Sequence, residues 1–304
     1  MDKFAKLFQD IGKLLDTYWL SYLNGIGNTL ILAIAATVAG CIIGLGCGIL
    51  NTIPYTKQDN PVKRFFLKLI RVIVRCYVEL FRGTPMVLQA VFVFFGLPYF
   101  TDGQIAFKGM AGLWAASLIV VSINTGAYMA ESVRGGIVSI DPGQTEGAKA
   151  IGMTHWQTMI RVILPQAIRN IIPQIGNNFI INIKDTSVMF VIGFVEFFAV
   201  HRNIVGINLL YFPSAVIEMA GYLTLTLLAS FGLRWVEKKM DGSANYELVQ
   251  TDALAMSAGT YTHPKRGSNF DEQSKEFHAR SAREKEKRTR ILQELRFGRP
   301  KGDR

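Results

Sequence analysis

Four polar residues stand out because they lie inside or at the edge of long apolar stretches: Asn124, Lys184, Asp185 and Glu218. Charged side chains within a bilayer are costly, so they usually mark a pathway for a polar solute or pair with a buried partner. Lys184 and Asp185 interrupt one stretch, where a broken helix could present backbone groups to a polar ligand. Pairing of these two with other residues at the membrane boundary is the alternative, and the pattern leaves both open.

Motifs for enzymatic chemistry are absent from the sequence. It lacks the GxxxxGK[ST] loop that cradles nucleotide phosphates, the HExxH pair of metalloproteases and the GxSxG turn of hydrolases. Its four histidines and three cysteines are scattered, without the spacing of metal ligands. We therefore expect no catalytic residue, no metal and no cofactor on this chain.

Long apolar segments are the elements that would position the polar residues. Residues 25–50 carry no charge, and as a helix they would span roughly 39 Å, enough to cross a bilayer core of about 30 Å. Half of the 304 residues are hydrophobic. Because these residues are clustered, the pattern predicts an all-α membrane protein. Five spans are expected, at residues 25–50, 85–100, 111–133, 168–200 and 213–236.

Two further segments are amphipathic and are predicted to lie at the membrane surface. In residues 1–24, apolar residues recur at spacings of four and three, and no cleavable signal peptide is expected. Residues 61–83 carry a single polar stripe at helical spacing, formed by Arg64, Lys68, Arg71, Arg75, Glu79 and Arg82. The chain is expected to enter the bilayer at Thr84-Pro85, since proline suits the start of a helix.

The distribution of basic residues predicts the orientation. Basic residues gather in the link before the second span and in the link between the third and fourth spans, so both links should be cytoplasmic. Five spans then place the N-terminus outside and the C-terminus in the cytoplasm. Residues 241–304 are predicted to form a polar, basic cytoplasmic tail, partly disordered. Its mixed charges argue against binding of nucleic acid.

The polar segment 143–165 lies in the second of these cytoplasmic links. Its sequence predicts a short helix that starts near Glu146, after the turn signal of residues 141–144, with an acid in its first turn. Small residues keep one side slim, Gly152 lets the backbone turn, and Leu164-Pro165 starts the next span. A slim helix held by turns at both ends suits insertion into a cleft of another protein. An ordinary loop helix is the alternative.

The amino-acid sequence of this segment resembles that of a known protein family. GQTEGAKAIGMTHWQTMIRVILPQA is similar to the Glu-Ala-Ala (EAA) loop of permeases from ATP-binding-cassette (ABC) importers. ELFRGTP (79–85), AYMAESVRGGIVSIDPGQ (127–144) and NIKDTSVMFVIG (182–193) resemble the polar amino-acid branch of that family, over about residues 25–240. One departure is Gly147 in place of the first alanine, which costs a helix interior up to about 1 kcal/mol. The resemblance implies a type I importer transmembrane domain and assigns coupling to Glu146, Gly147, Ala148, Gly152, Leu164 and Pro165.

The resemblance also implies a function and a set of partners. The chain would be the permease subunit of an ATP-driven importer of polar amino acids in the cell membrane of a prokaryote, embedded in the lipid bilayer. Its partners would be ABC ATPase subunits that bind the ATP, a second permease subunit that is identical or related, and an extracytoplasmic solute-binding protein. The alternatives are an importer of another solute, a scaffold acting through its tail, and a self-sufficient channel or secondary transporter, which would often show two repeated halves.

Overall fold

The computed structural model of the chain describes residues 2–53 and 60–240, and within them every regular element is a helix. The described residues belong to one compact unit, Met1–Gly242. The tail predicted at residues 241–304 lies outside the described residues, as do residues 54–59 of the first link.

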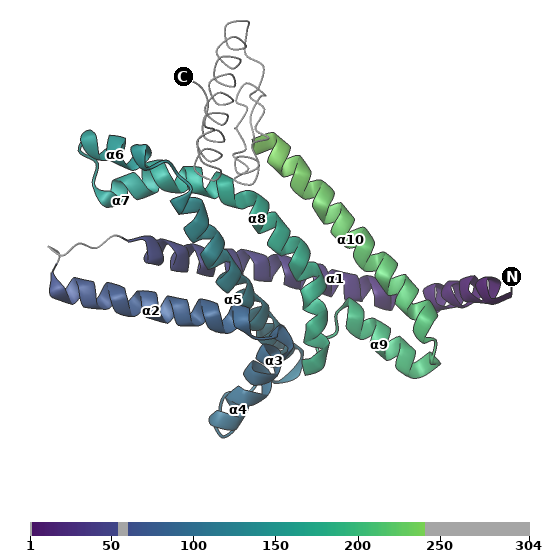
Figure 1. The fold of residues 1–304 in the computed structure, drawn as a ribbon. Helices are drawn as coiled ribbons and strands as arrows, with labels where there is room; N and C mark the ends of the chain where they lie inside the picture. The colour runs from purple at the N-terminus through teal and green to yellow at the C-terminus, as the bar shows by residue number, and fades with distance from the viewer. Residues whose placement is uncertain (1, 54–59, 241–304) are drawn as a thin grey trace, which may run out of the picture. The chain divides into compact units, whose positions relative to one another are not determined.

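The helices follow one another with short connections (Figure 1). In chain order they are α1 (Asp2–Thr52), α2 (Pro61–Gly83), α3 (Met86–Val91), the π-helical turn η1 (Phe92–Gly96), α4 (Leu97–Phe100), α5 (Gly109–Val138), α6 (Pro142–Ala150), α7 (His155–Thr158), the π-helical turn η2 (Met159–Ile163), α8 (Leu164–Asp185), the 3₁₀ helix η3 (Thr186–Ile192), α9 (Phe197–Asn208) and α10 (Tyr211–Met240).

Within the described residues, three helical segments are long and apolar enough to cross a membrane, at Lys3–Thr52, Gly109–Val138 and Tyr211–Lys239. Two bent pairs pass the same test together: Pro61–Gly83 with Met86–Phe100, bent by 111°, and His155–Ile192 with Phe197–Asn208, bent by 50°. Counting each bent pair as one span gives up to five, although the sequence predicts residues 85–100 alone as the second span.

The first helix differs from the prediction, because no break separates residues 1–24 from the first span. Helix α1 runs without interruption from Asp2 to Thr52. Phe4 and Phe8 of its predicted surface face are exposed, but Tyr22 is buried against Phe197 of α9, with its hydroxyl 3.4 Å from the Ser214 hydroxyl of α10. Part of the amphipathic face therefore packs inside the protein.

The second region confirms the predicted break at Thr84-Pro85. Helix α2 ends at Gly83, and the sharp bend of 111° follows before α3 starts. The Asn60 side chain caps the start of α2 by accepting a hydrogen bond from the Val62 amide. The polar stripe of α2 adjoins its buried face, which is formed by Leu67, Val74 and Val78.

The fourth region is broken later than predicted. Helix α8 continues through Lys184 and Asp185, and η3 follows from Thr186 to Ile192. Gly193, with a φ of 88°, ends η3 before the 50° bend into α9. Residues 201–212 are not a simple link, because α9 extends through residue 208. Gly193 is in the left-handed conformation, and the buried acid Glu196 caps the start of α9. Together they fix where the break between the two helices lies.

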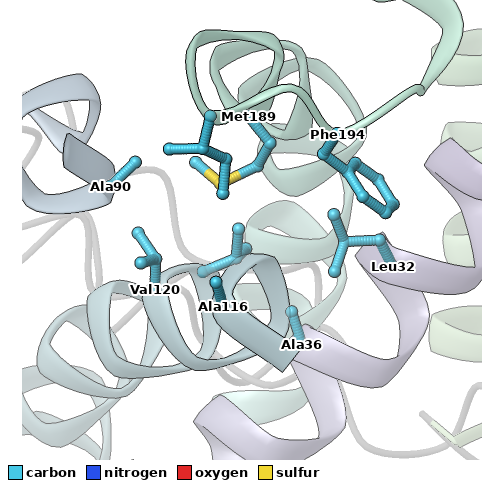
Figure 2. Packing of buried hydrophobic residues seen from close by; sticks show 9 residues of the cluster. Leu32, Ala36, Ala90, Ala116, Val120, Met189 and Phe194 are labelled. Carbon is cyan, nitrogen blue, oxygen red and sulfur yellow. The ribbon is translucent and has the colours of Figure 1, made fainter. Parts of the chain in front are cut away.

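A buried apolar cluster holds the broken segment against the first and third spans. Met189 and Phe194 face Leu32 and Ala36 of α1 and Ala116 and Val120 of α5, while Ala90 of α3 closes the side (Figure 2). The short side chains on α1, α3 and α5 let the helices approach closely around the larger Met189 and Phe194.

Helices α1 and α5 are in close contact through three glycines spaced by four residues. A Cβ at Gly40, Gly44 or Gly48 would collide with Thr125, Met129 or Val133 of α5, respectively. Small residues at every fourth position let helix backbones pack directly, which is the main way that helices associate in a bilayer.

Candidate functional site

A polar cavity of about 420 Å³ lies among the start of α3, the middle of α5 and the end of α8. It brings together two of the four candidate residues, Asn124 and Asp185. Its polar lining consists of Thr84, Asn124, Thr125, Tyr128, Asn178, Asn182 and Asp185, and Pro85, Met86, Ile181 and Val188 complete it. Lys184 is exposed and does not line the cavity.

Helical periodicity explains why these residues share the cavity. On α8, Asn178, Ile181, Asn182 and Asp185 follow one another at spacings of three, one and three, so they occupy one face of the helix. Asn124 and Tyr128, four residues apart, do the same on α5. The bend at Thr84-Pro85 supplies the remaining wall, since it ends α2 beside these two faces.

Gln89 connects the bend to α5. Its side-chain amide donates to the carbonyls of Phe81 and Thr84, both at 3.0 Å, and to the Thr84 hydroxyl at 2.9 Å. The Asn124 amide donates to the Gln89 side-chain oxygen and to the Phe81 carbonyl, each at 3.1 Å. These bonds satisfy carbonyls left open where α2 ends, and they orient Asn124 at the cavity wall.

Asn182 bridges α8 to α1 and α5 at the cavity. Its side-chain oxygen accepts from the Thr125 hydroxyl at 3.1 Å, and its amide donates to the Thr37 hydroxyl at 2.8 Å. All three side chains are buried. Interhelical hydrogen bonds of this kind fix which faces of apolar helices meet.

We expect Asn182→Ala to destabilise the protein by about 1–2 kcal/mol, because it removes both bonds and leaves the buried Thr125 hydroxyl without its acceptor. The thermal unfolding midpoint in detergent should fall by about 2–8 °C. Asn177→Ala is the matched control on the same helix, since Asn177 is exposed. Equal midpoints for the two variants would show that the bridge contributes nothing.

Glu218 lies outside the cavity, in a separate buried cluster. Its carboxylate is 3.3 Å from Nδ1 of His201, which is also 2.8 Å from the Ser214 hydroxyl. The neighbouring Glu196 is fully buried and caps α9, accepting from the amides of Phe198 and Ala199 at 2.8 Å and from the Tyr222 hydroxyl at 2.9 Å. Glu196 therefore links α9 to Tyr222 of α10. Within the described residues, Glu218 has the His201 ring beside one carboxylate oxygen and no hydrogen-bond partner for the other.

The segment 143–165 is not one helix but two that lie next to each other at the end of α5 (Figure 1). Helix α6 begins at Pro142, capped by Asp141, whose carboxylate accepts from the Gly143 amide. Glu146 therefore lies in the second turn rather than the first. Glu146 and Gly147 are exposed, whereas Ala148 is buried.

Gly152 makes the predicted turn, with a φ of 81°. The amides of Gly152 and Met153 donate to the carbonyls of Lys149 and Ala148, the paired bonds of a Schellman motif. Two residues later, Thr154 and Gln157 cap α7 reciprocally through side chain and backbone. This Thr-x-x-Gln pattern is a helix-start signal that identifies α7 in the sequence.

Helix α8 begins at Leu164, as predicted, but it directly continues the helical turns before it instead of following a loop. The chain is helical from His155 onward, and the π-helical turn η2 immediately precedes Leu164. Proline lacks an amide hydrogen and clashes with the carbonyl four residues earlier, here that of Arg161 within η2. The widened π turn accommodates this clash, as η1 does before Pro98.

Three polar residues in or beside the cavity were not predicted from the sequence as site residues: Gln89, Asn178 and Asn182. All three are buried. Spacing offered a signal for two of them, because Asn178, Asn182 and Asp185 share a helix face. Within the residues that the structure describes, no group of three or more histidine, cysteine, aspartate or glutamate residues could hold a metal ion.

The described residues thus form a helical chain with membrane-length segments, two bent helix pairs and a polar cavity between the helices. The family described as the inner membrane component of binding-protein-dependent transport systems matches residues 62–242. The chain belongs to this family, and it is a permease subunit of the ABC-importer class.

Named relatives agree with this assignment. The glutamine transport system permease protein GlnP of Escherichia coli (strain K12) is 35% identical over 221 residues, which cover 72% of this chain and 92% of that protein. The probable amino-acid permease protein YxeN of Bacillus subtilis (strain 168) is 37% identical over 204 residues, covering 66% and 83%. A crystal structure of an amino acid ABC transporter with histidines is 32% identical, with a TM-score of 0.63, covering 74% of this chain and 96% of that one.

Proposed function

We propose that this chain forms the translocation pathway of an ATP-driven importer of polar amino acids in the cell membrane of a prokaryote. One observation carries the proposal: Asn124 and Asp185, far apart in the sequence, line a single polar cavity between helices of a membrane protein. Transport of glutamine by one relative and the histidines in a solved relative support amino acids as the substrate class.

The cavity has groups for both ends of an amino acid. Asp185 supplies a carboxylate for the α-ammonium group, and such charge-assisted bonds are the stronger ones. The amide hydrogens of Asn124 and Asn178 already donate within the protein, so their side-chain oxygens can accept from the ammonium group, while the Tyr128 hydroxyl can donate to the carboxylate. A volume of about 420 Å³ suits a small polar solute.

Coupling to separate ATPase subunits is assigned to the segment 143–165. Glu146, Gly147 and Gly152 are exposed on it, while Ala148 packs inward. Leu164 and Pro165 are the first residues of α8. The Gln166 amide, 3.4 Å from the Gln144 side-chain oxygen, ties α6 to α8. A displacement of α6 would therefore be transmitted to α8, the helix that carries Asp185.

The remaining partners follow from this assignment. ATP would be bound and hydrolysed on the partner ATPases, and the segment 143–165 would face the cytoplasm, with the N-terminus outside. A second permease subunit, identical or related, would complete the pathway, and an extracytoplasmic binding protein would deliver the solute.

Co-purification tests the coupling assignment. The tagged chain is extracted from its native membrane in mild detergent, with and without Glu146→Lys. We expect a stoichiometric ABC ATPase subunit with the wild type, and at least tenfold less with Glu146→Lys, because the charge reversal lies on the exposed face of α6.

The matched control is Asp16→Lys, the same reversal at an exposed position of α1, which should retain the ATPase. No ATPase with the wild type would overturn the importer proposal. An ATPase retained equally by both variants would instead remove Glu146 from the contact.

A further inference from the structure

A second polar cavity, of about 340 Å³, lies between α2, α5 and the end of α1. Its polar lining is strongly charged and of mixed sign: Asn51, Arg71, Arg75, Glu79, Glu131 and Arg134. Two carboxylates and three guanidinium groups therefore face one space. None of these residues is needed for the cavity that contains Asp185.

The two cavities follow one another along α5. Asn124 and Tyr128 line the first, Glu131 and Arg134 line the second, and helical spacing places all four on one side of α5. Glu131 is seven residues beyond Asn124, or roughly 10 Å along the helix, toward the segment 143–165. Arg82 of α2 lies over the Tyr128 ring, 5.4 Å from its centroid, and Tyr128 comes between Asn124 and Glu131 along α5.

The charged side chains of the second cavity differ in whether they form ion pairs or hydrogen bonds with the rest of the protein. Arg134 donates two hydrogen bonds to Glu131, the shorter at 2.8 Å, so these two charges largely compensate each other. Arg71 donates to the Ile53 carbonyl. Within residues 2–53 and 60–240, Arg75 and Glu79 form no ion pair or side-chain hydrogen bond, and both are exposed.

Arg75 and Glu79 are four residues apart on α2, so their side chains lie next to each other, with about 5–6 Å between the Cβ atoms. A guanidinium binds a carboxylate with two parallel hydrogen bonds, and a carboxylate binds an ammonium group. An amino-acid zwitterion, whose ammonium and carboxylate groups are bonded to the same carbon, can satisfy both side chains at once. A phosphate group would instead meet the two carboxylates, Glu79 and Glu131, in the same space.

We propose that this second cavity is a transit site for the zwitterionic amino acid, occupied after the first cavity on the way toward the segment 143–165. Arg75 binds the α-carboxylate, Glu79 binds the α-ammonium group, and the Arg82–Tyr128 pair separates the two sites. This inference rests on the proposed function, because it takes the same substrate class for the first cavity.

The test is a count of bound ligand on the assembled permease–ATPase complex, without binding protein, in nanodiscs of phosphatidylcholine. The probes are radiolabelled L-glutamine and L-histidine. We expect two molecules per permease chain in the wild type. Arg75→Ala and the nearly isosteric Glu79→Gln should each weaken one binding event at least tenfold and leave the other. Lys68→Ala is the control, because Lys68 is exposed on α2 outside the cavity.

Asp185→Asn separates this inference from the proposed function. One molecule per wild-type chain, lost in Asp185→Asn and unchanged by Arg75→Ala, would overturn the second site and leave the first. No binding of either probe by the wild type would overturn both. Loss of the second event when phosphatidylglycerol is added to the nanodisc would mean that a lipid headgroup occupies the cavity, which also overturns the inference.

Discussion

Gly44→Leu is expected to prevent the stable packing of α1 on α5 and so to cause a large loss of stability. A Cβ at position 44 would collide with the Met129 Cβ, and it would lie 2.8 Å from the Met129 carbonyl carbon and 2.9 Å from the Ala130 nitrogen. The last two atoms belong to the backbone of α5. No side-chain rotation relieves such contacts, so the two helices must separate.

Separation of the helices disrupts more than one position. The same pair of helices is in close contact at Gly40 and Gly48, and Thr37 of α1 holds the Asn182 bridge. Overpacking that side chains can absorb costs about 1–3 kcal/mol. Here the cost should exceed that range, because the backbones themselves collide.

Size-exclusion chromatography and thermal unfolding of the detergent-solubilised chain measure this effect. The matched control is Gly46→Leu on the same helix, where a Cβ would have no neighbour within 4 Å. That variant should be as stable as the wild type or slightly more so, since glycine in a helix interior costs about 0.5–1 kcal/mol. A Gly44→Leu protein as monodisperse and as stable as Gly46→Leu would contradict the packing described for α1 and α5.

Asp185→Asn is expected to have the largest effect on transport. The substitution keeps the size of the side chain but removes the carboxylate charge that faces the first cavity. Hydrogen bonds to charged groups contribute about 1.5–3 kcal/mol, so uptake at low substrate concentration should fall roughly 10- to 100-fold. Folding should be little affected, because Asp185 is only partly buried.

Uptake of radiolabelled L-glutamine and L-histidine into proteoliposomes with the complete transporter measures this prediction. Asp102→Asn provides the same chemical change in an exposed turn, where the φ of 47° suits asparagine as well as aspartate. That control should transport like the wild type. Uptake by Asp185→Asn within twofold of the wild type would remove Asp185 from the pathway.

Local patterns in the sequence predicted much of the helical architecture. The uncharged run before residue 50, the polar stripe on α2, the break at Thr84-Pro85 and the turn at Gly152 each depend on residues close together in the chain. Their positions were predicted because helical periodicity and the backbone preferences of glycine and proline act locally. The local signal was incomplete at Leu164-Pro165, where α8 does begin but directly continues the π-helical turn η2.

The coupling segment illustrates the same limit. Glu146 was expected in a first turn, but Asp141 caps the helix one turn earlier, and the Thr154–Gln157 pair starts a second helix that the small residues before it did not indicate. Asp141 and the Thr154–Gln157 pair are both helix-start signals in the sequence, as is Glu146. The structure shows that helices start at the first two and not at Glu146.

The sequence by itself determined the class of protein, the number of apolar segments and the order of the family motifs. Only the tertiary structure decided which polar residues meet: Asn124 joins Asp185 in one cavity, Lys184 lies outside it, and Glu218 pairs with His201. The physical reason is that periodicity defines the faces of a single helix. Which faces meet depends on contacts between distant segments, such as the glycines of α1 against α5 and the Asn182 bridge.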